Sequence, residues 1–424
     1  MRINIKTVFC NFLFATVLSA IFGLCTMLSG TADTFELHRG ANFRQNILIM
    51  RWPSGLNTRL FPEGSFGVSA TRARIWSRVY RGAFVLNGAV ESKANFFSSG
   101  TDSGGLFGEG GGIFGTSRPL ERWDLTAGHI EEKSMNLRTR LERLDLRGTI
   151  SRFDIDIGRQ PVSLGTSHFV GVLDVIAPFA PGDLDATYKP GVDAVRVRRG
   201  IGMTGEAEII AVGEKKWRDG AFLGRSRCSL KVIDVELVGG YFRRRTFGGI
   251  GWEGGIGSCG LWGEMALFQR RKDHEVYRGG WSEAAFSGVA GLDVRLADNT
   301  IVGAALMFQD FGVRDPEDLT DVYSDAPYQE GWVFLGSASY GVVTVHRQLH
   351  PLVNGDVAGL VNLIDGSSLW QPRLTISTGD NSDLSVYGWI GTGKKARIDG
   401  TIVTMRSEFG MLPDGCGFYA RWFF

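Results

Sequence analysis

The sequence predicts an all-β fold, a transmembrane antiparallel up-and-down β-barrel, and three observations support that prediction. Segments with period-2 alternation of apolar and polar side chains recur along most of the chain. Glycine accounts for 59 of the 424 residues and aromatic side chains are frequent, as short strands with aromatic girdles require. Residues 417–424 alternate bulky side chains up to a terminal aromatic residue, which suits a strand with one face toward lipid.

The N-terminal region, residues 1–32, predicts a signal peptide. Arg2 and Lys6 form a basic start, an apolar stretch covers residues 8–28, and small residues at 30–32 supply a cleavage site before Asp33. A stretch of this length also fits a retained membrane anchor. We interpret it as a signal peptide, which leaves residues 33–424 as the barrel. No second apolar run of membrane-spanning length follows, which argues against an α-helical membrane protein.

Charge and cysteine content argue against several other classes of protein. Without Arg2 and Lys6 the formal net charge changes from +1 to −1, which gives no indication of nucleic-acid binding. The remaining cysteines are three in number and do not predict a disulfide framework. No C-x-x-C-H haem motif occurs, and the acidic residues at 315–325 lack the spacing of a calcium loop. We therefore predict no cofactor and no metal site.

The alternating segments predict 18 strands, within a range of 16 to 18. In chain order the predicted strands are 35–43, 66–80, 83–96, 137–149, 151–160, 191–199, 203–213, 222–231, 234–243, 249–258, 261–270, 281–296, 300–311, 332–348, 355–364, 369–378, 383–391 and 415–424. Residues 401–409 also fit a strand, which would change the count. The last strand is expected to pair with the first, so that the sheet has no open edge.

The connections between these strands divide into long and short ones. If both chain ends lie on the periplasmic side, the long connections all fall on the external side: 44–65, 97–136, 161–190, 271–280, 312–331 and 392–414. The opposite connections are short, such as 81–82 and 200–202. Outer-membrane barrels show this segregation, and a soluble sandwich has no reason for it. The stretch 97–116 is rich in Gly and Ser but lacks the ending of a phosphate-binding loop, so we expect a surface loop.

Two stretches resemble a known family. Residues 157–161 read Ile-Gly-Arg-Gln-Pro, residues 173–179 read Leu-Asp-Val-Ile-Ala-Pro-Phe, and residues 188–196 read Tyr-Lys-Pro-Gly-Val-Asp-Ala-Val-Arg. Together they resemble a strand–loop–strand unit of porin-like and alginate-export-like outer-membrane barrels. The ending, with Phe418, Trp422 and Phe424, resembles the C-terminal assembly signal of Gram-negative outer-membrane barrels. The resemblance implies an outer-membrane location and passive or secretory transport. The expected partners are outer-membrane lipid, lipopolysaccharide and the barrel-assembly machinery.

Alternation along the strands also predicts which charged side chains face the lumen, because arginine at the lipid midplane costs about 2–4 kcal/mol. The pore-lining candidates are Arg72, Arg74, Arg78, Arg143, Asp145, Arg147, Asp154, Asp156, Arg196, Arg198, Arg225 and Arg227. One interpretation is a lumen that favours anions, since rings of arginine attract them. The other is that arginines and carboxylates on neighbouring strands pair and brace the wall. Asp193 shares the apolar face of its strand and is expected near the rim.

The connection 161–190 is moderately apolar for an external loop. Two placements are open: it folds into the lumen as a constriction, or it packs against the barrel rim. If it constricts the lumen, deletion of residues 166–186 should raise the conductance.

The fold and these residues predict a porin-like channel for passive diffusion or export of small hydrophilic solutes, anionic or saccharide in character. The alternative is a structural or receptor barrel, or a sheath for a partner protein, that uses external loops. An outer-membrane hydrolase is less favoured. Ser167 and His168 are sequence neighbours, and adjacent strand residues face opposite ways. No G-x-S-x-G elbow occurs. We therefore predict that the protein is not an enzyme.

Overall fold

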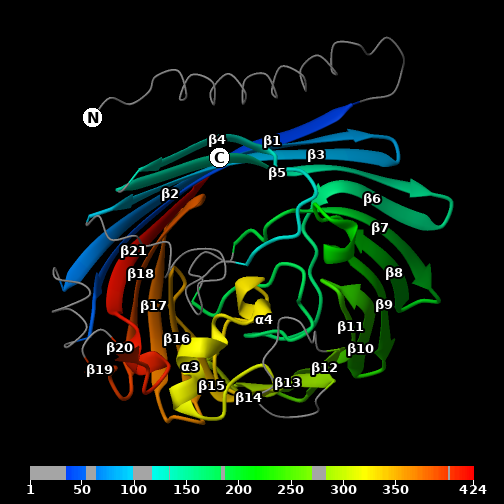
Figure 1. Ribbon diagram of the computed structural model, residues 1–424. Coiled ribbons are helices and arrows are strands. Elements are labelled where there is room, and N and C mark those ends of the chain that lie inside the picture. The colour runs from blue at the N-terminus through cyan, green and yellow to red at the C-terminus, as the bar shows by residue number, and fades with distance from the viewer. Residues whose placement is uncertain are drawn as a thin grey trace.

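The computed structural model describes residues 35–53, 64–98, 117–132, 134–182, 187–269, 283–399 and 402–424. They form an antiparallel sheet that closes into a barrel of 18 strands (Figure 1). The barrel strands are β1 (Glu36–Arg51), β2 (Ser65–Arg81), β3 (Phe84–Phe97), β5 (Met135–Ile150), β6 (Phe153–Gln160), β7 (Val192–Ile201), β8 (Gly205–Val212), β9 (Ala221–Leu230), β10 (Ile233–Phe242), β11 (Arg245–Ile256), β12 (Cys259–Gln269), β13 (Ala284–Arg295), β14 (Ile301–Gln309), β15 (Ser339–His350), β16 (Val353–Asn362), β17 (Ser368–Gly379), β18 (Ser382–Thr392) and β21 (Asp414–Phe423). The predicted fold class and strand number are confirmed. The predicted signal peptide lies outside the described residues.

Short elements accompany the barrel. β4 (Thr126–Glu132) pairs with the first half of β5, and β19 (Arg397–Asp399) pairs with β20 (Ile402–Thr404) in a separate hairpin. The helical turns are η2 (Trp217–Asp219), η3 (Pro316–Asp318), α3 (Leu319–Val322), α4 (Ala326–Gln329) and η4 (Phe409–Met411). Within the described residues, none of these helices is long and apolar enough to cross a membrane. Residues 401–409, which also fitted a strand, contribute to β20 and η4 and leave the barrel count unchanged.

The barrel closes where β1 meets β21, in a register that runs from Asn42 opposite Phe423 to Arg51 opposite Asp414. The predicted first strand, 35–43, was too short, because β1 continues to Arg51 through residues assigned to the loop 44–65. Residues 47–50 read Ile-Leu-Ile-Met and do not alternate in polarity. Leu48 and Met50 are buried inside the barrel, so both faces of the strand are apolar there and the period-2 signal disappears.

A second predicted strand boundary was wrong, again because apolar residues on the inside of the barrel do not alternate with polar ones. The predicted strand 332–348 begins too early, since β15 starts at Ser339. Trp332, Val333 and Leu335 instead belong to a loop whose apolar side chains are buried. A short apolar run cannot reveal by itself whether it is a strand or a buried loop.

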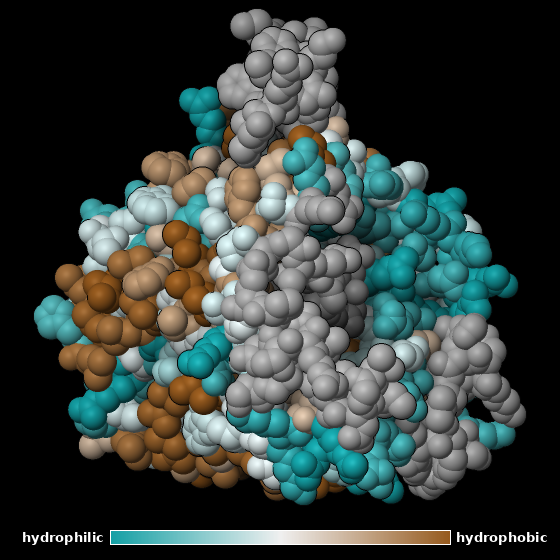
Figure 2. Space-filling view, turned by 60° about the vertical axis from the view of Figure 1, so that its left-hand side comes forward, coloured by the Kyte–Doolittle hydropathy of each residue, from teal (hydrophilic) through white to brown (hydrophobic). Residues whose placement is uncertain are grey.

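The two faces of the wall differ in chemistry. Large apolar side chains point outward from strands all around the barrel, among them Ile47, Ile209, Leu237, Leu306 and Phe418. Figure 2 shows apolar side chains gathered in patches on the barrel wall, with hydrophilic ones beside them. An apolar surface of this extent suits contact with lipid. The inner face instead carries ion pairs along some strands and buried aromatic residues along others.

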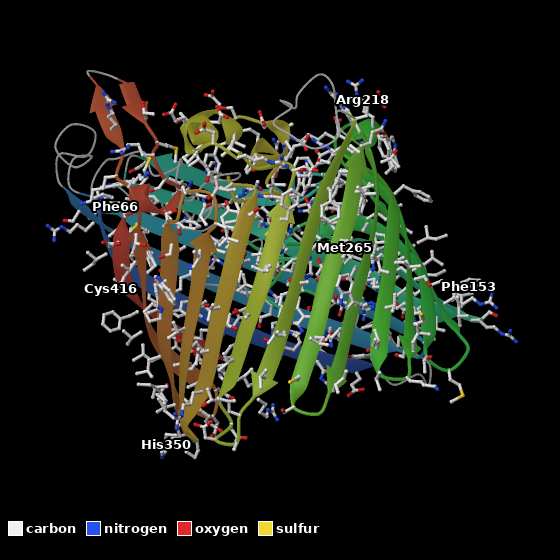
Figure 3. The ribbon with its side chains drawn as sticks, turned by 90° about the horizontal axis from the view of Figure 1, so that it is seen from below. Phe66, Phe153, Arg218, Met265, His350 and Cys416 are labelled. Carbon is white, nitrogen blue, oxygen red and sulfur yellow. The ribbon has the colours of Figure 1, made fainter. Side chains whose placement is uncertain are left out.

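Loops from one end of the barrel fold into it. Figure 1 looks along the barrel and shows α4 and the connection between β6 and β7 within the ring of strands. Figure 3 shows that α3 and α4 lie at the end where Arg218 is labelled, whereas His350 marks the opposite end. The long connections that the structure describes therefore gather at one end of the strands and the short turns at the other, as the chain parity predicts. The predicted connection 271–280 lies outside the described residues.

Candidate functional site

The inner wall from β5 to β7 holds its charges in cross-strand pairs. Asp156 on β6 lies between two arginines: Arg147 Nε on β5 is 2.7 Å from one carboxylate oxygen, and an Nη of Arg198 on β7 is 2.8 Å from the other. The register explains this, because Arg147 is opposite Asp156 and Arg198 is diagonal to it. The Asp156 carboxylate is fully buried, whereas the Arg147 side chain is 49% exposed.

The same arrangement continues across β7 to β10. Arg196 Nε contacts Glu208 at 2.6 Å, and Arg225 on β9 contacts Glu208 at 2.9 Å and Glu206 at 3.2 Å. Next along, Arg227 pairs with Glu236 on β10. Again the arginine is open, with 46% of the Arg227 side chain exposed against 1% for Glu236. In the Arg147–Asp156 and Arg227–Glu236 pairs the carboxylate therefore lies behind the guanidinium group, whereas Glu206 is more exposed than its partner Arg225.

A third group of charges covers β1, β2, β3 and β5. Arg44 binds Glu91 at 2.8 Å, and Arg74 binds Glu142 at 2.6 Å. Arg143 binds the other oxygen of Glu142 at 2.8 Å. A register shift at Ala89 and Val90 places Glu142 and Arg143, which are consecutive residues, side by side in this group.

Three of the other pore-lining candidates, Arg78, Asp145 and Asp154, form hydrogen bonds with uncharged side chains. Asn87 donates to Asp145 at 2.7 Å and accepts from Arg78 at 2.8 Å. Thr149 donates to Asp154 at 2.6 Å. Arg72 lies opposite Arg44 and Lys93 in the strand register. The structure thus places the candidates in several separate groups of paired or hydrogen-bonded side chains, and their role in solute passage stays a prediction.

The connection between β6 and β7, residues 161–191, folds into the barrel and is fixed there by Glu264 on β12. This carboxylate is completely buried and accepts four backbone N–H groups: Thr166 at 2.5 Å and Ser167 at 2.7 Å on one oxygen, and Val172 at 2.7 Å and Leu173 at 3.0 Å on the other. Gly165 has φ +87°, and a Cβ there would lie 2.2 Å from Glu264 Oε1. The glycine is therefore required for the loop to approach this carboxylate.

Further contacts hold the start of this loop. Gly165 N–H donates to Glu236 at 2.8 Å, and Arg225 donates to the carbonyl of Ser163 at 3.2 Å. His168 lies between Asp293, at 2.7 Å, and Glu253, at 3.2 Å. Ser167 donates its hydroxyl to the carbonyl of Val170, 2.9 Å away, so it is not directed at His168.

The end of the loop contacts a different part of the wall. Arg143 donates to the carbonyl of Lys189, and the Lys189 ammonium pairs with Asp174 within the loop at 2.5 Å. The guanidinium groups of Arg44 and Arg74 lie over the Tyr188 ring, 5.1 and 4.4 Å from its centroid. The loop thus extends from β12 to β1 and β2. Of the two placements that the sequence left open, the structure supports the one inside the barrel.

The inner wall from β10 to β15 carries buried aromatic and aliphatic side chains, together with the buried charged residues Glu236, Arg245 and Glu264. Trp332, from the connection between β14 and β15, contacts Phe242, Phe268 and Phe311 with ring centroids 5.1–5.7 Å apart. Arg245 lies over the Trp332 ring at 5.2 Å and binds Glu330 at 2.8 Å. This aromatic cluster fixes the second inward loop on the wall.

A buried carboxylate, Glu408, joins the remaining loops. It accepts from the hydroxyls of Tyr323 and Tyr340, from Gly336 N–H and from Asn362 Nδ2 at 2.5–3.0 Å. Burial raises the pKa of the Glu408 carboxyl, although the hydroxyl and amide donors oppose that shift. The connections 310–338 and 393–413 are therefore held together.

Sequence reasoning did not single out Glu264, Tyr188, Trp332 or Glu408. One signal was available for Glu264, which interrupts the run Leu-Trp-Gly-Glu-Met-Ala over residues 261–266 and must face the inside of a barrel. Asp193 lies in the second position of β7, at its rim end, as predicted. It binds Arg159 at 2.8 Å and accepts from the backbone of Arg122 and Trp123.

The architecture was compared with known proteins. No family model and no curated protein matches the sequence. Solved structures match it over nearly its full length. Acinetobacter baumannii OccAB4 has a TM-score of 0.57 at 11% identity, with 93% of this chain and 100% of that chain covered. Acinetobacter baumannii OccAB1 has a TM-score of 0.54 at 8% identity, with 92% and 96% covered. These neighbours are Gram-negative outer-membrane porins.

The fold of this chain is the closed antiparallel barrel of these solved structures. A third neighbour, Pseudomonas aeruginosa OccK11 (OpdR), agrees, with a TM-score of 0.50, 10% identity, and 91% of this chain and 95% of that chain covered. The predicted outer-membrane barrel is confirmed at the level of the fold. At these identities the likeness concerns the backbone architecture, so the solute and its path have to be argued from this chain's own residues.

Proposed function

We propose that the protein is a channel of the outer membrane through which small hydrophilic solutes, anionic or saccharide in character, pass by diffusion or export. One observation carries the proposal. A loop fixed by Glu264 and Tyr188 extends across the inside of a closed barrel, next to a wall lined by arginines. A barrel of this size is wide enough for an aqueous lumen, and an inward loop narrows it.

The proposal extends to ion preference. The exposed arginines Arg147 and Arg227 have partner carboxylates that are almost completely buried. A solute in the lumen therefore meets the guanidinium groups before the carboxylates. Cross-strand pairing braces the wall, and the asymmetry of exposure leaves a positive inner surface. Both interpretations that the sequence left open contribute to this proposal.

Conductance of the refolded protein in a planar bilayer tests the function. We expect discrete ohmic steps and, in a salt gradient, a reversal potential that shows preference for anions. Cation preference would overturn the proposed selectivity while leaving a channel. A silent, correctly folded barrel that co-purifies with a second chain would instead support the structural or sheath alternative.

Removal of the inward loop tests the constriction. Replacement of residues 166–182 by a short Gly-Ser linker should raise the single-channel conductance severalfold, because the segment held by Glu264 no longer occupies the barrel. A matched control shortens the connection 393–413 at residues 395–397, which lie away from this loop. An unchanged conductance in the 166–182 variant would refute a constriction.

A further inference from the structure

The turn between β8 and β9, residues 213–220, carries a concentration of positive charge at the rim. Lys215 and Lys216 are adjacent, Arg218 follows two residues later, and all three are exposed. Arg122, from the segment before β4, is exposed beside them and donates to the carbonyls of Glu214 and Lys215. We call the set Arg122, Lys215, Lys216 and Arg218 the rim cations.

The rim cations lie directly above an aromatic outer surface. Phe222 on β9 and Tyr241 on β10 are register partners and both are exposed on the outer wall. The Tyr241 hydroxyl donates to the carbonyl of Arg218 at 2.8 Å. Aromatic residues with a polar group mark the boundary between the apolar band and water in membrane barrels. The turn therefore lies at headgroup height, at the end of the barrel where Figure 3 labels Arg218.

Two exposed tryptophans flank the same charges. The Trp217 side chain is 73% exposed and Trp123 is 61% exposed. Both sit on backbone that is held in place: Trp123 N–H donates to Asp193 at 3.1 Å, and η2 contains Trp217. Indole rings favour the lipid–water interface, where their apolar body and N–H group are both satisfied.

The carboxylates of this region do not neutralise the rim cations. Asp219 binds Arg244 at 2.7 Å, Asp124 accepts from Thr126 N–H at 3.1 Å, and Glu214 accepts from the N–H of Lys215 at 3.0 Å. Among the described residues, no carboxylate lies within 4 Å of the side-chain nitrogens of Lys215, Lys216 or Arg218. Positive charge at headgroup height attracts anionic lipid, and each such residue near the surface contributes about 1 kcal/mol.

We propose that the rim cations and the two tryptophans bind the phosphorylated headgroup of an outer-leaflet lipid. The cations contact its phosphates, and the indole rings contact the part of its acyl chains next to the headgroup. This rests on the outer-membrane location in the proposed function. The chemistry required of the ligand is a phosphate-bearing headgroup joined to an apolar body. A bare phosphate ion satisfies only the first part, and a neutral lipid satisfies only the second.

Native mass spectrometry of the folded barrel in detergent tests the site with three probes: diphosphorylated lipid A, its dephosphorylated form, and inorganic phosphate. We expect adducts with diphosphorylated lipid A and at least about tenfold weaker binding of the dephosphorylated form. Competition by millimolar inorganic phosphate alone would show a free-anion site and overturn a lipid site.

The variant K215A/K216A/R218A should weaken lipid A binding by about tenfold or more, since each cation contributes a factor of about five at an anionic surface. The matched control R152A/R199A/R295A removes three exposed cations from the opposite end and should bind as the unchanged protein does. Equal lipid A binding by both variants would overturn the proposal, as would a change of oligomeric state in K215A/K216A/R218A without a change in lipid binding.

The two proposals fail separately. Lipid A adducts on a barrel that conducts no ions would reject the channel and retain the lipid site. Normal conductance with no preference for phosphorylated lipid would retain the channel and reject the lipid site. Heat-modifiable migration in gels confirms that each variant is folded before either measurement.

Discussion

The inner wall from β1 to β9 and the inner wall from β10 to β15 face the same barrel interior but use different chemistry. The first is a network of arginine–carboxylate pairs such as Arg147 with Asp156 and Arg196 with Glu208. The second buries aromatic residues, with Trp332 against Phe268 and Phe311. Their outer faces are alike, since apolar side chains point outward from both.

The chemistry of the inner wall depends on whether loops cover it. Where side chains remain partly open, as with Arg147 and Arg227, charge is tolerated and each carboxylate is satisfied by a neighbouring strand. Where loops cover the wall, apolar contacts resemble a soluble core, and a buried charge such as Glu264 is satisfied by backbone N–H groups of the loop. We interpret the charged wall as the side along which solute passes and the aromatic wall as the support for the loops.

The largest expected effect is on the aromatic wall. Trp332→Ala removes a buried ring in contact with three others and should lower the free energy of unfolding by about 3–5 kcal/mol. Urea titration of the refolded barrel measures this. Trp123→Ala, which removes an exposed ring, is the control. A large change in ion selectivity for Trp332→Ala would break the division between the two walls.

Glu264→Ala should lower the free energy of unfolding by about 3 kcal/mol, because four N–H groups of the inward loop, two of them buried, lose their acceptor. We also expect a larger and less steady conductance as the loop detaches from β12. Glu253→Ala, which removes an exposed carboxylate that contacts the same loop through His168, serves as the control. Steady wild-type conductance in Glu264→Ala would show that the aromatic wall does not support the constriction.

Deletion of Phe424 acts on the seam that closes the barrel. Phe424 exchanges two backbone hydrogen bonds with Ala41, at 2.8 and 3.0 Å. Their loss should lower the free energy of unfolding of the assembled barrel by about 1–2 kcal/mol. We predict a lower yield of assembled barrel and unchanged conductance per assembled molecule. Phe423→Ala, which keeps the terminal aromatic residue, is the matched control. Normal yield of the truncated chain would contradict an assembly role for this ending.

The smallest expected effect on stability is on the charged wall. Arg147→Gln with Arg227→Gln removes two exposed guanidinium groups. The free energy of unfolding should fall by only about 1 kcal/mol, because each buried partner carboxylate keeps a second donor, Arg198 for Asp156 and Gly165 N–H for Glu236. The reversal potential should nevertheless shift toward cations. The control, Arg39→Gln with Arg295→Gln, removes two exposed arginines away from these pairs. An unchanged reversal potential would show that solute does not pass along this wall.

Much of the fold was predictable because outward side chains all meet one environment. Phe418, Trp422 and Phe424 alternate with Tyr419 and Arg421, and the structure exposes the first three on the outer wall. The prediction was wrong where the inner face is apolar too, as at Leu48 and Met50. It was also wrong at Trp332 and Val333, because a buried loop and a strand give the same apolar run.

The candidate site was predictable in part. Alternation identified the arginines and carboxylates, but their partners depend on strand register, which a hydrophobic pattern fixes only through neighbouring strands. Arg198 therefore pairs with Asp156 rather than with a residue near it in sequence. The roles of Glu264 and Tyr188 were not predicted, because each depends on a contact between the inward loop and a distant strand.

The sequence alone predicted the barrel, a range of 16 to 18 strands and the outward face of each strand, because lipid imposes the same two-residue period on every strand. The tertiary structure alone decided where the loops go. Glu264 binds Thr166 across 98 positions of sequence, and Glu408 meets Tyr340 across 68. Such contacts depend on the closed barrel, because closure brings distant residues into one interior and excludes water from the groups they satisfy.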